Sequence, residues 1–304
     1  MTPSGQPPVA AARSYQCPWC GMVSDGTALS CPACGAPVDV RAVATRSGWY
    51  ELPPIKDMAR LQFGQSYCQI EGNFVPVADL NLVGTDSVYF THHVLLWRDL
   101  TVSITTLPLR GGWKRLFAGL PLIMTQAHGP GHIAFSRDAP GEMIALPLSP
   151  GQAIDVREHL FMVATGQITY DWFNTGIWYT TRKGDETETH YPLGMFMDRF
   201  YAPQVPGFVL VHAAGNAFIR HLAPGEPILI KPTSLLFKDP TVNMQLHIEE
   251  PSGGNFGFWT SWNQRYVWLR LVGPGRVAIQ SAFKHMEENG RNITRTSDAT
   301  RRRW

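Results

Sequence analysis

Hydrophobic and polar positions between residues 57 and 285 follow the pattern of β-strands. Apolar residues alternate with other residues on both sides of a Pro-Gly pair: Met143 and Ala145 precede it, and Ile154 and Val156 follow it. A period of two places these side chains on one face of each strand, and that face is buried. Proline fixes φ at one turn position and glycine accepts a positive φ at the next. The pair therefore predicts a tight turn between two strands.

This pattern recurs along the chain. Residues 141–171 align without a gap on residues 215–245 after a shift of 74 positions, and Pro150-Gly151 then meets Pro224-Gly225. A weaker copy, FVPVADLNLVGTDSVYFTHHVLLWRD, aligns on the same unit after a shift of 66. Units of this kind cannot bury their apolar faces alone, so the copies are expected to share one core.

A second element, Gly-Pro-Gly, occurs at residues 129–131 and 273–275, and each copy follows a Gly-Gly pair and an aromatic-rich stretch. Together the two elements predict an all-β body over residues 57–285, a pseudo-repeat β-sandwich or β-helix. Composition agrees, because charged residues are 16% of the chain, below the usual quarter, while 28 glycines and 24 prolines supply turns.

Four of the five cysteines form two Cys-x-x-Cys pairs near the N-terminus. Cys17 and Cys20 make one pair, Cys31 and Cys34 make the other, and a glycine follows each pair. Two such knuckles supply four thiolates in the tetrahedral arrangement that Zn²⁺ prefers, so we predict a zinc ribbon over residues 14–40. Four cysteine ligands leave no open coordination position, which makes this zinc structural. Two disulfides, a redox pair and an iron centre are the alternatives.

The flanking segments complete the expected organisation. We expect a disordered N-terminus over residues 1–13, a proline-containing linker over 41–56 and a basic, flexible tail over 286–304. The remaining cysteine, Cys68, is expected to be a buried apolar residue. The N-terminus lacks the pattern of a signal peptide and no run of 18 apolar residues occurs, so we expect a cytoplasmic protein.

Net charge bears on the class of partner. The chain has 26 basic and 24 acidic residues, a formal charge of +2. That balance gives no global electrostatic basis for binding nucleic acid, so nucleic acid is not the expected partner.

The order and spacing of these motifs resemble a known family. GPGHIAF, APGEMIALPLSPGQAIDVREHLFMVAT and WLRLVGPGRVAIQS resemble the family of the mitochondrial protein called altered inheritance of mitochondria 24, over about residues 57–284. The resemblance implies a β-rich fold like that of the tryptophan RNA-binding attenuation protein. It also implies a role related to the inner-membrane organisation with which the mitochondrial member is associated. The chain departs from the family pattern at GGWKRLFAGLPLIMTQA and in the added cysteine cluster.

No set of catalytic residues assembles in the sequence. His92 and His93 are adjacent, which on a strand would direct them to opposite faces, and the His-x-His pair of cupin enzymes is absent. His128 and His132 flank Gly-Pro-Gly, which excludes the helix that their spacing would need to bind zinc. We therefore expect a protein that is not an enzyme.

Aromatic residues mark candidate interaction surfaces. Trp172, Phe173, Trp178 and Tyr179 lie in a long insert, residues 172–203, whose centre is charged, and a hairpin with a solvated tip fits this pattern. Trp113 and Phe117 would share one face of a short amphipathic segment with Lys114 and Arg115 beside it, a pattern compatible with a lipid surface.

The function expected from these features is that of a non-enzymatic scaffold or binding protein. It would be a homo-oligomer and would dock a protein partner through its zinc ribbon. Three alternatives remain open: a protein that organises a membrane surface by peripheral contact, an RNA-binding protein that uses the rim of the β body, and a metal-dependent cupin-like enzyme.

Overall fold

The chain divides into two compact units, residues Met1–Pro53 and Pro54–Trp304. We call them the N-terminal unit and the β body and describe each by itself. The structure is a computed structural model that describes residues 14–16, 22–25, 32–33, 49–51, 61–108, 123–249, 266–283 and 293–297. Throughout these ranges, no helix has the length and apolar character needed to cross a membrane.

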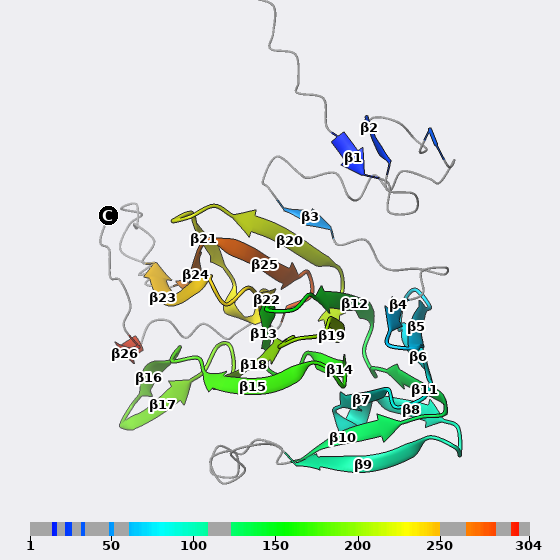
Figure 1. The fold of residues 1–304 in the computed structure, drawn as a ribbon. Coiled ribbons are helices and arrows are strands. Elements are labelled where there is room, and N and C mark those ends of the chain that lie inside the picture. Colours follow the sequence, from blue (N-terminus) through cyan, green and yellow to red (C-terminus); the bar gives the residue numbers. More distant parts are fainter. Residues whose placement is uncertain are drawn as a thin grey trace, which may run out of the picture. The chain divides into compact units, whose positions relative to one another are not determined.

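The β body consists of antiparallel strands, coloured from cyan to red in Figure 1. It starts with a hairpin of β4 (Leu61–Phe63) and β5 (Ser66–Glu71) and continues with three modules of similar strand order. The first module comprises, in its described part, β6 (Val77–Leu82), β7 (Ser87–Phe90), the 3-10 helix η2 (His92–Val94), β8 (Leu95–Arg98), β9 (Ser103–Pro108), β10 (Ile123–His128) and β11 (Gly131–Ser136).

The second and third modules follow the same plan. The second comprises β12 (Gly141–Leu148), β13 (Ala153–Arg157), β14 (Phe161–Thr165), β15 (Thr169–Asn174), β18 (Phe196–Tyr201) and β19 (Gly207–Ala214). Its insert adds β16 (Tyr179–Lys183) and β17 (Glu186–His190). The third comprises β20 (Ala217–Leu222), β21 (Pro227–Ile230), the 3-10 helix η3 (Pro232–Ser234), β22 (Leu235–Lys238), β23 (Asn243–Glu249), β24 (Tyr266–Val272) and β25 (Gly275–Gln280).

Each module builds two layers of three paired strands. The layer that holds the first strand of the module is called the leading sheet, and the other the trailing sheet. The leading sheets have the orders β6-β11-β8, β12-β19-β14 and β20-β25-β22. The trailing sheets have the orders β7-β10-β9, β13-β18-β15 and β21-β24-β23. Each of the strands β6, β7, β8 and β9 begins 140 residues before its counterpart in the third module, β20, β21, β22 or β23. This distance is the sum of the two shifts, 66 and 74, found in the sequence.

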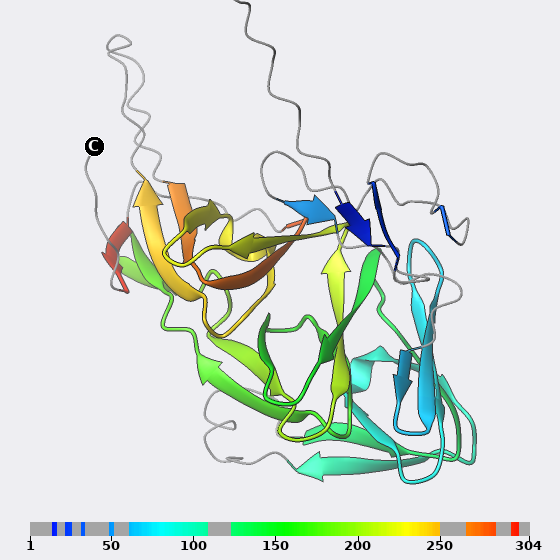
Figure 2. The ribbon, with the colours of Figure 1, turned by 45° about the horizontal axis from the view of Figure 1, so that its top comes forward.

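Neighbouring modules are joined by strand pairing. The trailing sheet of the first module pairs through β7 with β14 of the second, and Phe90 lies opposite Val163. The trailing sheet of the second pairs through β13 with β22 of the third, and Val156 lies opposite Phe237. The sequence shifts of 66 and 74 convert the first pair into the second, so the two junctions have the same register. Figure 2 shows the modules following one another from cyan to orange.

The predicted turns form, but they connect different sheets. The backbone N–H of Gln152 donates to the carbonyl of Ser149, and Gly151 between them has φ +81°. The corresponding Gly225 has φ +76°. The strands on either side do not pair with each other as a simple hairpin would require, since β12 pairs with β19 and β13 with β18. Each turn therefore carries the chain from the leading sheet to the trailing sheet, and the strands on its two sides pair within different sheets.

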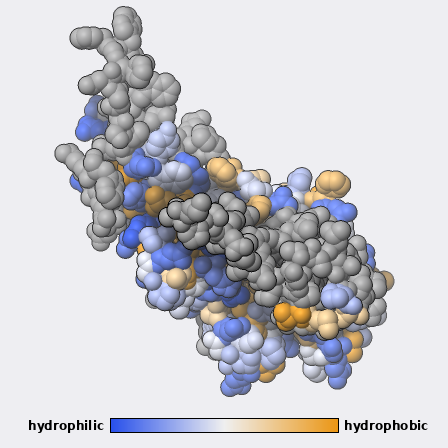
Figure 3. All heavy atoms as spheres, turned by 90° about the horizontal axis from the view of Figure 1, so that it is seen from above, coloured by the Kyte–Doolittle hydropathy of each residue, from blue (hydrophilic) through white to orange (hydrophobic). Residues whose placement is uncertain are grey.

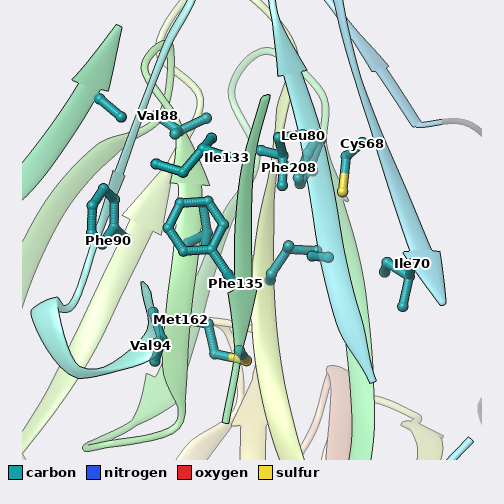
Figure 4. Packing of buried hydrophobic residues seen from close by; sticks show 14 of the residues in the cluster. Cys68, Ile70, Leu80, Val88, Phe90, Val94, Ile133, Phe135, Met162 and Phe208 are labelled. Atoms are coloured by element: carbon teal, nitrogen blue, oxygen red, sulfur yellow. The ribbon is translucent and has the colours of Figure 1, made fainter. Parts of the chain in front are cut away.

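Apolar side chains from facing sheets fill the core. Phe90 of β7 and Phe135 of β11 are fully buried with ring centroids 4.7 Å apart, and Phe208 of β19 meets Phe63 edge to face at 5.3 Å. Figure 4 shows these strands directing their side chains into one space, with the Cys68 sulfur at its margin. Each fully buried phenylalanine contributes about 1.5–3 kcal/mol. The all-β prediction is confirmed, and so is the burial of Cys68.

Two predicted features lie at the periphery. The centre of the insert is the hairpin β16–β17, with Gly184 at φ +63° in its turn and exposed residues beyond it, as the charge pattern predicted. Within the segment expected to be a flexible tail, β26 (Ile293–Thr296) pairs with β16. Ile293 is buried and lies opposite Thr181 of β16.

Candidate functional site

The cysteine cluster lies in the N-terminal unit, which also contains β3 (Tyr50–Glu51). Cys17, Cys20, Cys31 and Cys34 are outside the described residues. Their neighbours include β1 (Ser14–Gln16) and β2 (Val23–Asp25), which are antiparallel, with Gln16 opposite Val23. In sequence, the first cysteine pair lies between these two strands, and the turn residues 32–33 lie between Cys31 and Cys34. A donor set of four thiolates suits Zn²⁺.

The structure describes four of the six aromatic residues that were predicted to form interaction surfaces. Trp113 and Phe117 lie outside the described residues. Trp172 and Phe173 lie at the end of β15, Trp178 precedes β16, and Tyr179 starts that strand. Tyr179 is buried, while the other three are half-buried, so the insert exposes part of each ring.

The side chains of Trp172 and Phe173 pack against residues of β18. Trp172 packs edge to face on Phe196 at 4.8 Å, and the guanidinium carbon of Arg199 lies 4.7 Å from the centre of the Phe173 ring. Residues 172 and 198, and residues 173 and 197, are direct partners across the β15–β18 ladder. Strand pairing fixes the backbone under both residues, and because they are neighbours on one strand, their side chains point to opposite faces of it.

A buried network of charges lies beneath Phe173. Arg199 donates two hydrogen bonds to Asp155 of β13, from Nε at 2.6 Å and from Nη2 at 2.9 Å, and Lys238 of β22 donates a third at 2.8 Å. Asp155 is fully buried and Lys238 nearly so. The hydrogen bond with Asp155 raises the pKa of Arg199, while burial lowers the pKa of Lys238 against the attraction of the carboxylate. The network joins the second module to the third, because Asp155 and Lys238 are partners across their junction.

This network escaped the sequence analysis. The signal for it was an acidic residue within the apolar strand AIDVR and a lysine at the end of the apolar run SLLFK. An isolated charge in such a strand indicates a buried partner, but the sequence does not say which residue supplies it.

The other end of the insert borders an open pocket of about 510 Å³. Ser297 fixes its wall, since its backbone N–H and hydroxyl both donate to the carbonyl of Trp178. Tyr179 stacks on His190 at 4.9 Å, and His190 lies 2.7 Å from the Thr181 hydroxyl. The lining comes from the insert, the third module and β26: residues 175–178, Met244, Gln245, Thr296 and Ser297.

Several histidines of the β body make contacts within the fold. His132 Nδ1 lies 3.0 Å from the Asp79 carboxylate, across the β6–β11 pair. His212 is buried beside the Ala139 carbonyl, and burial lowers its pKa, with the charge of Arg137 adding to the shift. His92 and His93 lie on η2, a correction to the strand on which they were placed. Over the described part of the chain, no three metal-binding side chains gather in one group.

The exposed surface is mixed in character. On the face in Figure 3, apolar residues form small separate areas among polar ones. The strongly exposed apolar side chains of the β body include Phe74, Leu96, Trp97, Leu100 and Leu229. Nothing in the hydrophobic pattern of the sequence distinguished these residues from core positions.

Comparisons with known proteins identify the fold and the family of this region. The family described as "Mitochondrial biogenesis AIM24" matches residues 68–282. The chain is similar in structure to protein SPYM3_0169 from Streptococcus pyogenes, with a TM-score of 0.52 and 19% sequence identity. The similarity covers 72% of this chain and 94% of that chain. No curated protein matches the sequence.

Proposed function

Because the chain belongs to the AIM24 family, we propose that it is a non-catalytic scaffold that assembles with copies of itself and holds protein partners. The N-terminal cysteines, with Zn²⁺ bound, form a docking module. The β body supplies a rigid platform and a second binding surface on its aromatic insert.

The observation that carries this proposal is the way the aromatic residues of the insert are supported. Trp172 and Phe173 are half-buried on opposite faces of β15, where Phe196 packs against the first ring and Arg199 against the second, and the backbone N–H of the half-buried Trp178 donates to the Ser297 hydroxyl. Rings that are held in place lose little conformational entropy when a partner covers them, and tryptophan is enriched among residues that dominate binding energy. The adjacent open pocket gives a partner a place for one side chain.

Affinity capture with the full-length chain tests the proposal. Trp178→Ala alters the insert surface, and the double variant Cys17→Ser/Cys20→Ser removes two proposed zinc ligands. Both should reduce recovery of a protein partner at least tenfold, while Phe74→Ala, at an exposed residue away from the insert, should not. Conversion of a metabolite by the purified chain at a rate that depends on a histidine of the β body would contradict the proposal.

A further inference from the structure

The two junctions between modules have a common geometry. At the first, Phe90 pairs with Val163 and Tyr89 with Ala164; at the second, Val156 pairs with Phe237. All of these side chains are buried. Backbone bonds extend the first junction at both ends, since Thr91 N–H donates to the Met162 carbonyl and Gly166 N–H to the Ser87 carbonyl.

The third module has the strand that would make another such junction. β21 corresponds to β7 and β13, which pair with the next module, yet among the described residues β21 pairs with β24 alone. At the other end of the β body, β8 corresponds to β14 and β22, and within those same ranges it pairs with β11 alone. Figures 1 and 2 show the first and third modules at opposite ends of the β body, so β8 and β21 do not meet in one chain.

Both strands expose apolar side chains at positions whose counterparts in the paired strands are buried. Leu96 and Trp97 of β8 are 55% and 45% exposed, and Leu229 of β21 is 40% exposed. The residues that correspond to Leu96 and Trp97 are Met162 and Val163 in the second module, which are fully buried. These two positions of the strand are therefore buried in the module that pairs with a preceding module, and exposed on β8, which has no such neighbour among the described residues.

The outer strands of the trailing sheets provide a comparison within the molecule. β9 and β23 also pair on one side only in the described part of the chain, but polar residues make up half of SITTLP and four of the seven residues of NMQLHIE. β8 and β21, with the sequences LLWR and PILI, are largely apolar. Free strand edges in soluble proteins normally carry polar or charged residues, so an apolar edge indicates a covering strand.

We propose that β8 of one copy pairs antiparallel with β21 of another copy, continuing the pairing between modules from chain to chain. The sequence shifts fix the register, with Trp97 opposite Ile230 and Arg98 opposite Leu229. The Gly166–Ser87 bond at the end of the first junction predicts one more here, from Leu100 N–H to the Pro227 carbonyl. The occupant of each edge is a second copy of this chain, because only a module of this kind reproduces the register of both edges.

The contact joins two different edges, so the association is head to tail. Such a contact closes into a ring or extends as an open chain, and it differs from a two-fold dimer, in which an edge meets itself. The inference rests on the proposed scaffold function and specifies how copies would assemble.

Cross-linking between two variants of the full-length chain tests the register. Residues that face each other across an antiparallel pair have Cα atoms about 4.5–5.5 Å apart, within the range of Cα distances that a disulfide spans. Trp97→Cys mixed with Ile230→Cys should cross-link under mild oxidation, while Trp97→Cys mixed with Ile228→Cys, two residues out of register, should give at least tenfold less. Neither variant alone should exceed the background of the wild-type cysteines. A strong link between two copies of Trp97→Cys would overturn the proposal by showing an edge that meets itself.

The mass of the assembly in solution provides a second test. The wild-type chain should elute as a multiple of 33.9 kDa, and Trp97→Lys should reduce it to a single chain. Trp97 is exposed, so the variant should fold, which circular dichroism checks. Ile104→Lys places the same charge on the exposed edge strand β9 and should leave the assembly intact. A multimer that Trp97→Lys leaves intact overturns the inference but not the scaffold function, whereas a monomeric wild-type chain contradicts the assembly on which both depend.

Discussion

Asp155 is a fully buried carboxylate that depends on nearby cations, and it accepts three hydrogen bonds from Arg199 and Lys238. Asp155→Asn leaves the nearly buried Lys238 ammonium without its counter-ion. Removal of one partner from a buried ion pair costs about 3–5 kcal/mol, and the free energy of unfolding in urea should fall by that amount. The double variant Asp155→Leu/Lys238→Met should regain most of the loss, because it removes both buried charges. Equal destabilisation in the single and double variants would show that packing, and not charge, governs the site.

His212 is a residue at which pH should change stability. Burial and the charge of Arg137 lower its pKa in the folded protein, while the unfolded chain has the usual value of about 6.5. As the pH falls below about 6.5, the unfolded chain binds a proton there that the folded chain does not, so this histidine favours unfolding until the pH reaches the folded-state pKa.

The variant His212→Gln isolates that contribution. Glutamine can still donate to the Ala139 carbonyl, and Gln280 takes the same place in the third module, since it lies opposite Ala217 as His212 lies opposite Met143. Urea unfolding at pH 7.5 and pH 5 should show a smaller loss of stability on acidification in the variant than in the wild type. An unchanged loss would place the acid sensitivity at other residues.

At the scale of elements, the sequence predicted the strands and turns better than the pairing. Alternation around Pro150-Gly151 specifies two strands and a turn because these depend on neighbouring residues alone. Which strands pair depends on residues far apart, and β13 finds β18 and β22 across the insert and across a module boundary. The Asp155 network was not predicted for the same reason, because its three residues lie far apart in the sequence. The aromatic residues of the insert were visible as a local cluster, but their supports, Phe196 and Arg199, come from another strand.

The strand β26 provides a prediction for the insert. Ile293 is buried and lies opposite Thr181 of β16, and the Thr294 hydroxyl lies 2.9 Å from that of Thr180. Ile293→Asp would bury a carboxylate and should release β26, since charge burial costs more than the pairing of a short strand provides. Hydrogen exchange should then accelerate at residues 179–181 while exchange in the core strands stays slow. Arg295→Gln, at an exposed position of the same strand, is the control, and equal exchange in the two variants would contradict the anchoring role.

At the scale of the whole molecule, the chain combines two units with different sources of stability. The β body has an extensive apolar core, whereas the N-terminal unit is short and depends, in our proposal, on its metal. Structural zinc contributes about 10–16 kcal/mol to the folding of small domains, so loss of the metal should unfold that unit alone.

Metal analysis combined with calorimetry tests this separation in the full-length chain. The wild type should contain one zinc ion per chain, and Cys17→Ser/Cys20→Ser should contain none while the main thermal transition of the β body stays unchanged. Cys68→Ser is the reciprocal control: it should keep the zinc but lower the stability of the β body by about 1–3 kcal/mol, because it buries a hydroxyl group among apolar side chains. A metal ion that survives loss of Cys17 and Cys20 would instead indicate a site within the β body and favour the enzyme alternative.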